Sequence, residues 1–173
     1  MKLIVCADDN WGIGKDNQLI YHSKKDMAFF KCATMNKVVI MGKNTCLSLP
    51  KKKLPKRINM ILSTTMHQPD DVDVFVYNSI DDIFQELIKS GKVNLAYVIG
   101  GQSIYELFLP YCTDAYVTHI IGSKPADTFF PNLDENSDWE KTIQGPIIEE
   151  GELKMEYLEY HNNNCKFPGP YGC

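Results

Sequence analysis

Short apolar segments of strand length recur between residue 3 and residue 121, and most of them show no alternation with polar residues. They are rich in Val, Ile and Leu, which is typical of strands covered on both faces. We expect strands at residues 3–7, 38–41, 58–62, 72–76, 95–99 and 115–121.

Segments with helical periodicity separate these strands. Residues 26–35 and 81–89 each carry an apolar stripe, and Ser79 is a candidate N-cap for the second helix. A short third helix at residues 103–109 ends at Pro110. Strands that alternate with helices predict an α/β fold with a central, mostly parallel sheet.

The last third of the chain has a different pattern. Residues 139–143 and 153–160 alternate more strongly and have no helix between them, which predicts a closing antiparallel hairpin. Residues 162–173 are rich in Asn, Pro and Gly, which predicts a disordered tail. We therefore expect a single domain over residues 1–161.

Charge and composition narrow the class of protein. The 173 residues include 18 basic and 22 acidic side chains, a net charge of −4, with 44% hydrophobic and 23% charged residues. This balance is ordinary for a globular domain, and its mild acidity argues against a partner that is a nucleic acid or a membrane surface. No apolar run reaches the roughly 18 residues of a membrane span, and the N-terminus lacks a secretory signal. We expect a cytoplasmic monomer.

The cysteines and histidines do not predict a metal site. The six cysteines show no CxxC spacing, and no pair of the four histidines forms an HExxH motif. Reduced thiols are the favoured interpretation for the cysteines, and no structural metal is expected.

Three predicted strand ends carry residues suited to an anion. Gly100 and Gly101 lead from a strand into a helix, where free N–H groups can receive a phosphate. Lys43 adds a cation at a similar junction, and Ser63 and Thr64 follow another strand. Together they predict one extended nucleotide site, because ligands of α/β sheets gather at the carboxyl ends of strands. Tight turns and ordinary caps explain each segment taken singly, and for the glycine pair alone the tight turn is favoured.

Asp26 has two interpretations. It is the only carboxylate on the stripe that carries Met27 and Phe30, so a neighbouring cleft would desolvate it and raise its pKa, as suits a proton-handling group. The segment from Ser23 to Asp26 also matches a capping box, in which Asp26 only stabilises the start of the helix. Spacing alone favours the cap.

Arg57 stands in a basic loop, residues 51–57, of an otherwise acidic chain. Its guanidinium is suited to bidentate binding of a substrate carboxylate, with the loop lysines steering anions toward it. A solvated basic loop is the alternative.

Taken in order, eight stretches of the chain resemble dihydrofolate reductase of the bacterial, single-domain kind. They are residues 11–17, 26–30, 39–45, 54–57, 61–63, 98–105, 118–120 and 127–131. The resemblance implies an eight-stranded, mostly parallel sheet with flanking helices. It also implies reduction of 7,8-dihydrofolate to 5,6,7,8-tetrahydrofolate, with hydride transfer from NADPH to C6 and protonation of N5.

The resemblance also implies roles for individual residues. Asp26 would hold the pterin, with Thr118 acting through a water, and would favour protonation of N5. Tyr21, preceded by Ile20, stands in place of the family's usual Trp near the substrate, and Arg57 would bind the α-carboxylate of the glutamate. The implied substrate pocket comprises Ile4, Val5, Cys6, Asp26, Met27, Phe30, Leu49, Leu54, Arg57, Ile99 and Tyr105.

The implied cofactor site extends over three strand ends. Cys6 and Ile13 would orient the nicotinamide carboxamide through backbone groups, and Lys43, Ser63 and Thr64 would meet the 2′-phosphate. The implied set is Cys6, Ile13, Gly14, Gly42, Lys43, Asn44, Thr45, Leu62, Ser63, Thr64, Ile99, Gly100, Gly101, Gln102, Ser103, Ile104 and Tyr105.

The chain departs from the family pattern at two places that bear on function. Ile20 and Tyr21 replace the usual Pro-Trp, and Ser103 stands where a cation is common, so discrimination for the 2′-phosphate depends more on Lys43. Two alternatives therefore stay open. One is a reductase of the same fold acting on another pteridine-like or ribosylated pyrimidine substrate. The other is a non-catalytic pterin- or nucleotide-binding protein.

Overall fold

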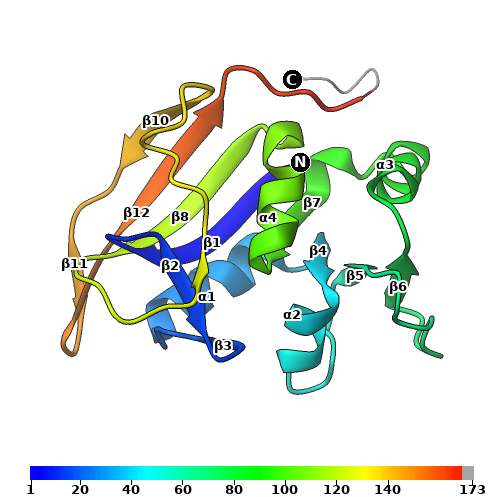
Figure 1. Cartoon of the computed structure of the whole chain (residues 1–173), viewed down its shortest axis with the longest axis horizontal. Coiled ribbons are helices and arrows are strands. Elements are labelled where there is room, and N and C mark those ends of the chain that lie inside the picture. The colour runs from blue at the N-terminus through cyan, green and yellow to red at the C-terminus, as the bar shows by residue number, and fades with distance from the viewer. Residues whose placement is uncertain (169–173) are drawn as a thin grey trace.

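The computed structural model describes residues 1–168, and its centre is an eight-stranded sheet in the order β10-β12-β8-β1-β7-β4-β5-β6 (Figure 1). Neighbouring strands from β8 to β6 pair in parallel, whereas β12 pairs antiparallel with both β8 and β10. The short strand β11 adds to β12 beyond this order. The strands are β1 Lys2–Asp8, β4 Val38–Gly42, β5 Ile58–Leu62, β6 Val74–Tyr77, β7 Ala96–Gly100, β8 Asp114–Ile120, β10 Trp139–Gln144, β11 Ile148–Glu150 and β12 Leu153–Asn162.

This architecture confirms the predicted α/β fold and its mostly parallel central sheet. The apolar runs form strands because both faces of the sheet are covered: Val39, Ile40 and Val98 have no exposed surface. One predicted strand begins too early. Val72 is 88% exposed, and the strand starts only at Val74, where the side chain is buried.

Four helices flank the sheet: α1 Lys24–Thr34, α2 Lys43–Ser48, α3 Ile80–Lys89 and α4 Gln102–Phe108. Short 3₁₀ turns lie at Val93–Leu95 and Leu109–Tyr111. Ser79 caps α3 as predicted, since its hydroxyl accepts a hydrogen bond from the Asp82 N–H at 3.1 Å. Within residues 1–168, no helix is long and apolar enough to cross a membrane.

A small antiparallel sheet, in the order β3-β2-β9, was not predicted from the sequence. Its strands are β2 Gly12–Lys15, β3 Gln18–Leu19 and β9 Thr128–Phe129. Asp16 and Asn17 join β2 to β3 with φ angles of 50° and 62°, the conformation of a two-residue hairpin turn. Asp127 ties this hairpin to the chain before β9, because its carboxylate accepts the Asp16 N–H at 2.8 Å and its own N–H donates to Gly14 at 3.0 Å.

The segment after residue 161 corrects the prediction of a disordered tail. Asn162 still belongs to β12, and the Lys166 N–H donates to the Pro110 carbonyl at 2.7 Å. Phe167 is only 6% exposed, and its ring centroid lies 4.9 Å from that of Phe84. The Asn-, Pro- and Gly-rich composition of the segment gave no indication that Phe167 would be buried. Residues 169–173 of the predicted tail lie outside the described residues.

The cysteines agree only in part with the prediction of reduced thiols. Cys6, Cys32, Cys46 and Cys112 are free. Cys165 is disulfide-bonded, which contradicts the prediction for this residue. Spacing along the chain does not show which sulfur atoms the fold brings together, so the absence of a CxxC motif could not exclude such a bond.

We predict that Phe167→Ala lowers the free energy of unfolding by about 3 kcal/mol, because it removes a buried aromatic ring packed edge-on against Phe84. Urea unfolding measures this loss. Val72→Ala, at a position that is 88% exposed, is the matched control and should change stability by less than about 0.5 kcal/mol. Equal stabilities of the two variants would show that the segment contributes nothing to the fold.

Candidate active site

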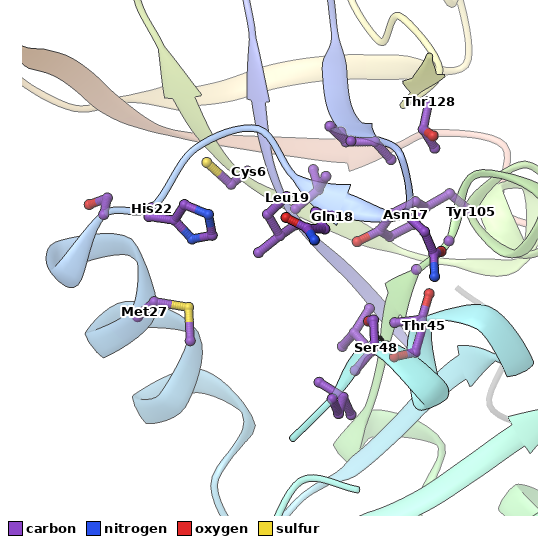
Figure 2. Close-up of a pocket in the computed structure, with 18 of the residues that line it drawn as sticks. Cys6, Asn17, Gln18, Leu19, His22, Met27, Thr45, Ser48, Tyr105 and Thr128 are labelled. Carbon is purple, nitrogen blue, oxygen red and sulfur yellow. Dashed lines mark hydrogen bonds between the residues drawn. The ribbon is translucent and has the colours of Figure 1, made fainter. Parts of the chain in front are cut away.

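A cleft of about 740 Å³ opens where β1 and β7 end, between α1, α2 and the hairpin of β2 and β3 (Figure 2). Figure 2 shows His22 and Met27 on one side of this space, with Thr45 and Ser48 of α2 on another. The lining is Val5, Cys6, Ile13, Gly14, Asn17, Gln18, Leu19, His22, Ser23, Lys24, Met27, Thr45, Ser48, Leu49, Pro50, Ile99, Gly100, Gly101, Tyr105 and Thr128.

A second cleft of about 470 Å³ adjoins the first, and the two share Asn17, Thr45, Gly101 and Thr128. Its lining carries amide, hydroxyl and ammonium groups, the carboxylate of Glu106, and few apolar side chains. The lining is Asn17, Gly42, Lys43, Asn44, Thr45, Leu62, Gly101, Gln102, Ser103, Ile104, Glu106 and Thr128. Together they form one elongated depression with a more apolar end and a more polar end.

Glycines keep the junction between the clefts open. Gly100 has a φ of +125°, which side chains rarely allow, and its peptide bond to Gly101 is cis. A Cβ atom on Gly101 would lie 3.4 Å from the Thr45 hydroxyl, and one on Gly42 would lie 3.0 Å from Ile104. Neither Gly42 nor Gly101 caps its helix with a side chain, so the first N–H groups of α2 and α4 have no side-chain cap.

Lys43 supplies the cation of the polar cleft. Its ammonium donates to the Thr65 hydroxyl at 3.0 Å, so it reaches the loop that follows β5. Ser63 shapes this loop, because its hydroxyl accepts the N–H groups of Thr65 and Met66 at 3.2 and 3.1 Å. Ser63 and Thr64 are close to the polar cleft in sequence but are not part of its lining.

The start of α1 is capped without the carboxylate of Asp26. Ser23 is the N-cap, and its hydroxyl accepts the Asp26 N–H at 3.0 Å. Glu150 of β11 accepts the N–H of Lys24 at 2.8 Å and that of Lys25 at 3.0 Å. Ser23 thus supplies its half of a capping box, but among the described residues no hydrogen bond joins the Asp26 carboxylate to the Ser23 N–H, so the reciprocal half is not made. The carboxylate of Asp26 is therefore available for another role.

Burial raises the pKa of Asp26, and this desolvation is the largest influence on it. The nearby Thr118 hydroxyl opposes the rise by favouring the charged carboxylate, and the negative charge of Glu150 adds to it. The Thr118 oxygen is buried and, within residues 1–168, has no hydrogen-bond partner of ordinary length and angle. An unsatisfied hydroxyl beside a desolvated carboxylate is a site prepared for a polar ligand.

The titratable groups that interact with Asp26 from β1 and α4 are uncharged at neutral pH. Burial raises the pKa of the Cys6 thiol and of the Tyr105 phenol, and the negative charge of Asp26 adds to both shifts. Tyr105 donates its hydroxyl to the Ile4 carbonyl at 2.8 Å. Cys6 and Tyr105 line the main cleft, and the nearest cation in its lining is Lys24, on the same helical turn as Asp26.

Arg57 lies near the C-terminal end of α1, far along the helix from Asp26. The residue is 6% exposed, and its guanidinium donates to the Pro55 carbonyl at 2.8 Å, the Thr34 hydroxyl at 3.2 Å and the Lys31 carbonyl at 3.3 Å. Burial alone lowers its pKa, and among the described residues no carboxylate pairs with it. Arg57 is thus a fixed, buried cation and not part of a mobile loop. A buried cation without an acidic partner favours the binding of an external anion.

Tyr21 is not part of either lining, which disagrees with the expectation that it stands in for a Trp near the substrate. Its ring is buried beside Ile120 and Met155, and its hydroxyl donates to Asp8 at 3.0 Å. The tyrosine hydroxyl can satisfy the buried Asp8 carboxylate, and this contact fixes the ring outside the cleft.

The two clefts bring together most of the residues that the sequence suggested. Ile4, Asp26, Phe30, Leu54, Arg57, Thr118, Ser63 and Thr64 lie outside the two linings. Sequence reasoning missed the Glu150 contact with α1 and ten residues of the linings: Asn17, Gln18, Leu19, His22, Ser23, Lys24, Ser48, Pro50, Glu106 and Thr128. A two-residue Asp16-Asn17 turn is the one local signal that could have located the hairpin.

Comparison of the sequence with known proteins shows the family of the chain. The family model described as dihydrofolate reductase matches residues 1–162. The dihydrofolate reductase of Bacillus subtilis is 32% identical over 173 residues, 99% of each chain. That of Ureaplasma parvum is 39% identical, covering 79% of this chain and 85% of its own. Dihydrofolate reductase type 9 of Escherichia coli is 32% identical, covering 95% of this chain and 94% of its own.

Proposed function

The chain belongs to the dihydrofolate reductase family, and on that premise we propose that it reduces 7,8-dihydrofolate to 5,6,7,8-tetrahydrofolate with NADPH. The hydride goes to C6 of the pterin and a proton to N5. The observation that carries this proposal is the desolvated Asp26 carboxylate beside the Thr118 hydroxyl, which has no hydrogen-bond partner within residues 1–168, next to two adjoining clefts.

Asp26 and Thr118 suit the amidine-like edge of a pterin. A carboxylate accepts two hydrogen bonds side by side from such an edge, and the Thr118 hydroxyl is free to bind a further polar group or a water. The negative charge that forms on Asp26 favours the protonated form of the substrate, so N5 carries its proton before the hydride arrives. Met27, Leu49 and Ile99 provide apolar surface for the rings.

Arg57 suits the far end of the same substrate. The glutamate of dihydrofolate carries an α-carboxylate, and the planar guanidinium binds such a group through two parallel hydrogen bonds. Its bonds to Thr34, Lys31 and Pro55 hold it in place before the substrate arrives, which lowers the entropic cost of binding.

The polar cleft has groups suited to the phosphates of NADPH. The glycines leave room where a Cβ would fill it, and the first N–H groups of α2 and α4 with Thr45 and Ser103 are donors for a diphosphate. Lys43, with the loop from Ser63 to Thr65, would hold the 2′-phosphate. When bound, the cofactor supplies the hydride, and the residues of the cleft orient it and exclude water.

A steady-state assay of NADPH oxidation tests the proposal against its two alternatives. We expect oxidation that depends on added dihydrofolate. Oxidation with a ribosylated pyrimidine in place of dihydrofolate would favour a reductase of another substrate class. Tight binding of both ligands without turnover would favour a binding protein. Arg57 argues for the folate, because a ribityl phosphate needs other anchors.

We predict that Lys43→Ala weakens NADPH much more than NADH. A charge-assisted contact to one phosphate contributes about 1.5–3 kcal/mol, so the KM for NADPH should rise about 10- to 100-fold. The KM for NADH, which lacks the 2′-phosphate, should change by no more than about twofold. Lys37→Ala, a cation outside both clefts, is the control. An equal loss for the two cofactors would show that Lys43 does not bind the 2′-phosphate.

A further inference from the structure

Glu150 makes an unusual set of contacts for a residue in a surface strand. Its two carboxylate oxygens accept three donors from the start of α1: the Ser23 hydroxyl at 2.6 Å and the N–H groups of Lys24 and Lys25 at 2.8 and 3.0 Å. Ser23 and Glu150 are 127 residues apart in the chain. The same bonds lower the pKa of Glu150, the Ser23 hydroxyl first, so the carboxylate stays charged.

These contacts form a cap that the helix does not supply itself. The first N–H groups of a helix carry its positive dipole end, and a carboxylate that accepts them is bound more tightly than a neutral group. Glu150 is held in turn by the β11–β12 pairing, in which it lies opposite Leu153. The N-terminal turn of α1 is therefore held by β11 of the central sheet as well as by its own N-cap, Ser23.

The position of this cap links it to the proposed chemistry. Asp26 follows Lys25 directly, and its own N–H is held by Ser23, whose hydroxyl Glu150 accepts. Ser23, Lys24 and Met27 line the main cleft. A shift of this turn moves the carboxylate of Asp26 relative to Thr118, which belongs to the rigid strand β8. Misplacement of about 1 Å at such a site is enough to slow a reaction severely.

We propose that Glu150 is a positioning residue for the reaction: its carboxylate fixes the first turn of α1 and so holds Asp26 against Thr118 at the edge of the cleft. This inference rests on the proposed function for its catalytic consequence. The anchoring itself is a property of the free protein and has its own test.

The charge of Glu150 has a second, separable effect. The titratable groups that face Asp26 are Cys6 of β1, Tyr105 of α4, Tyr157 of β12 and Glu150 of β11. Among these four, only Glu150 is charged at neutral pH, and as a like charge it raises the pKa of Asp26; the cations Lys24 and Lys25 precede Asp26 on its own helical turn. Loss of this charge therefore lowers the pKa of Asp26. The pH above which activity declines should shift downward accordingly.

Three substitutions separate anchoring from charge. Glu150→Ala removes both, Glu150→Asp keeps the charge on a shorter side chain, and Glu150→Gln keeps the length without the charge. We expect Glu150→Ala and Glu150→Asp to lower kcat/KM for dihydrofolate about tenfold and to leave the KM for NADPH within about twofold. Glu150→Asp should keep the apparent pKa of the pH–rate profile, whereas Glu150→Gln should lower it.

Two controls exclude general effects. Glu149→Gln removes the neighbouring carboxylate, which pairs only with exposed Lys154 at 3.3 Å. Ser79→Ala removes the cap of α3, a helix that lines neither cleft. It therefore reproduces the loss of helix stability that Glu150→Ala causes in α1, but at a distance from the site. Both controls should keep kcat/KM and the pH–rate profile of the unsubstituted protein. If Glu150→Ala resembles either control at equal thermal stability, Glu150 does not position Asp26.

Measurements on the free protein separate this proposal from the proposed function. We expect Glu150→Ala to speed the exchange of the Lys24 and Lys25 amide hydrogens, and Glu150→Gln to lower the pKa of Asp26 followed by NMR of its carboxyl carbon. Both results hold whether or not the protein reduces dihydrofolate. Unchanged exchange and an unchanged pKa would overturn the proposal even in an active enzyme. An inactive unsubstituted protein would instead overturn the proposed function.

Discussion

Asp26→Asn is expected to lower kcat at neutral pH by roughly 10²- to 10⁴-fold while the protein stays folded. Asn keeps the shape of the side chain but loses the negative charge that favours the protonated substrate. The fold should tolerate the change because Ser23 and Glu150 already serve the N–H groups at the start of α1. Steady-state kinetics and thermal unfolding, measured together, test both parts.

The same prediction includes a direction for the change of rate with pH. Burial raises the pKa of Asp26, and with substrate bound this carboxyl and N5 titrate as a coupled pair, so the rate of the unsubstituted protein should fall as the pH rises through the apparent pKa of the pair, where N5 loses its proton. In Asp26→Asn this step is lost. Its rate should recover in part at low pH, where dihydrofolate is protonated in solution.

Asp82→Asn is the matched control, because Asp82 stands three residues after the cap Ser79, as Asp26 stands three residues after Ser23. Both variants replace an aspartate by asparagine in a first helical turn, and only one is beside the cleft. Asp82→Asn should keep full activity. A folded Asp26→Asn protein with near-normal turnover at neutral pH would mean that Asp26 is only a helix-start residue.

Arg57→Lys is expected to raise the KM for dihydrofolate about 10- to 100-fold and to leave the KM for NADPH nearly unchanged. The ammonium group keeps the charge but cannot reproduce the planar fork, and it cannot replace all the bonds to Thr34, Pro55 and Lys31. Substrate titrations under saturating NADPH measure the change.

A substrate without the glutamate provides the control for this prediction. Arg57→Lys and the unsubstituted protein should use a dihydropterin equally well. Such a substrate lacks the carboxylate that the two proteins are expected to bind differently. Lys51→Ala, in the exposed part of the same loop, should change the KM for dihydrofolate by no more than about twofold. The opposite pattern, with Lys51 important and Arg57 not, would place the carboxylate among the loop lysines.

Much of the fold could be predicted from local pattern. Runs such as residues 38–41 read as buried strands because helices cover both faces of the sheet, and Ser79 reads as a cap because its hydroxyl has one local role. The small sheet could not be predicted, since β3 and β9 have only two residues each and pair with β2 through tertiary contacts. Phe167 was hidden because one aromatic in a polar segment carries no periodicity.

The site divides in the same way. Glycines and Lys43 at strand ends could be predicted because topology alone gathers them at one edge of the sheet. Spacing could not decide between the two interpretations of Asp26, because the groups that set its environment, Thr118 and Glu150, lie on distant strands, Glu150 being 124 residues away in sequence (150 − 26). The expectation for Tyr21 failed because the resemblance gives only its position in the sequence. It does not show that the hydroxyl bonds Asp8.

The most direct test of the central claim is a single turnover with NADPH deuterated at the transferable position of its nicotinamide ring. We expect the tetrahydrofolate product to carry one deuterium at C6, seen by NMR or mass spectrometry, and its formation to be abolished by Asp26→Asn at neutral pH on the same time scale. Product without deuterium at C6, or no product from a protein that binds both ligands, would contradict the account.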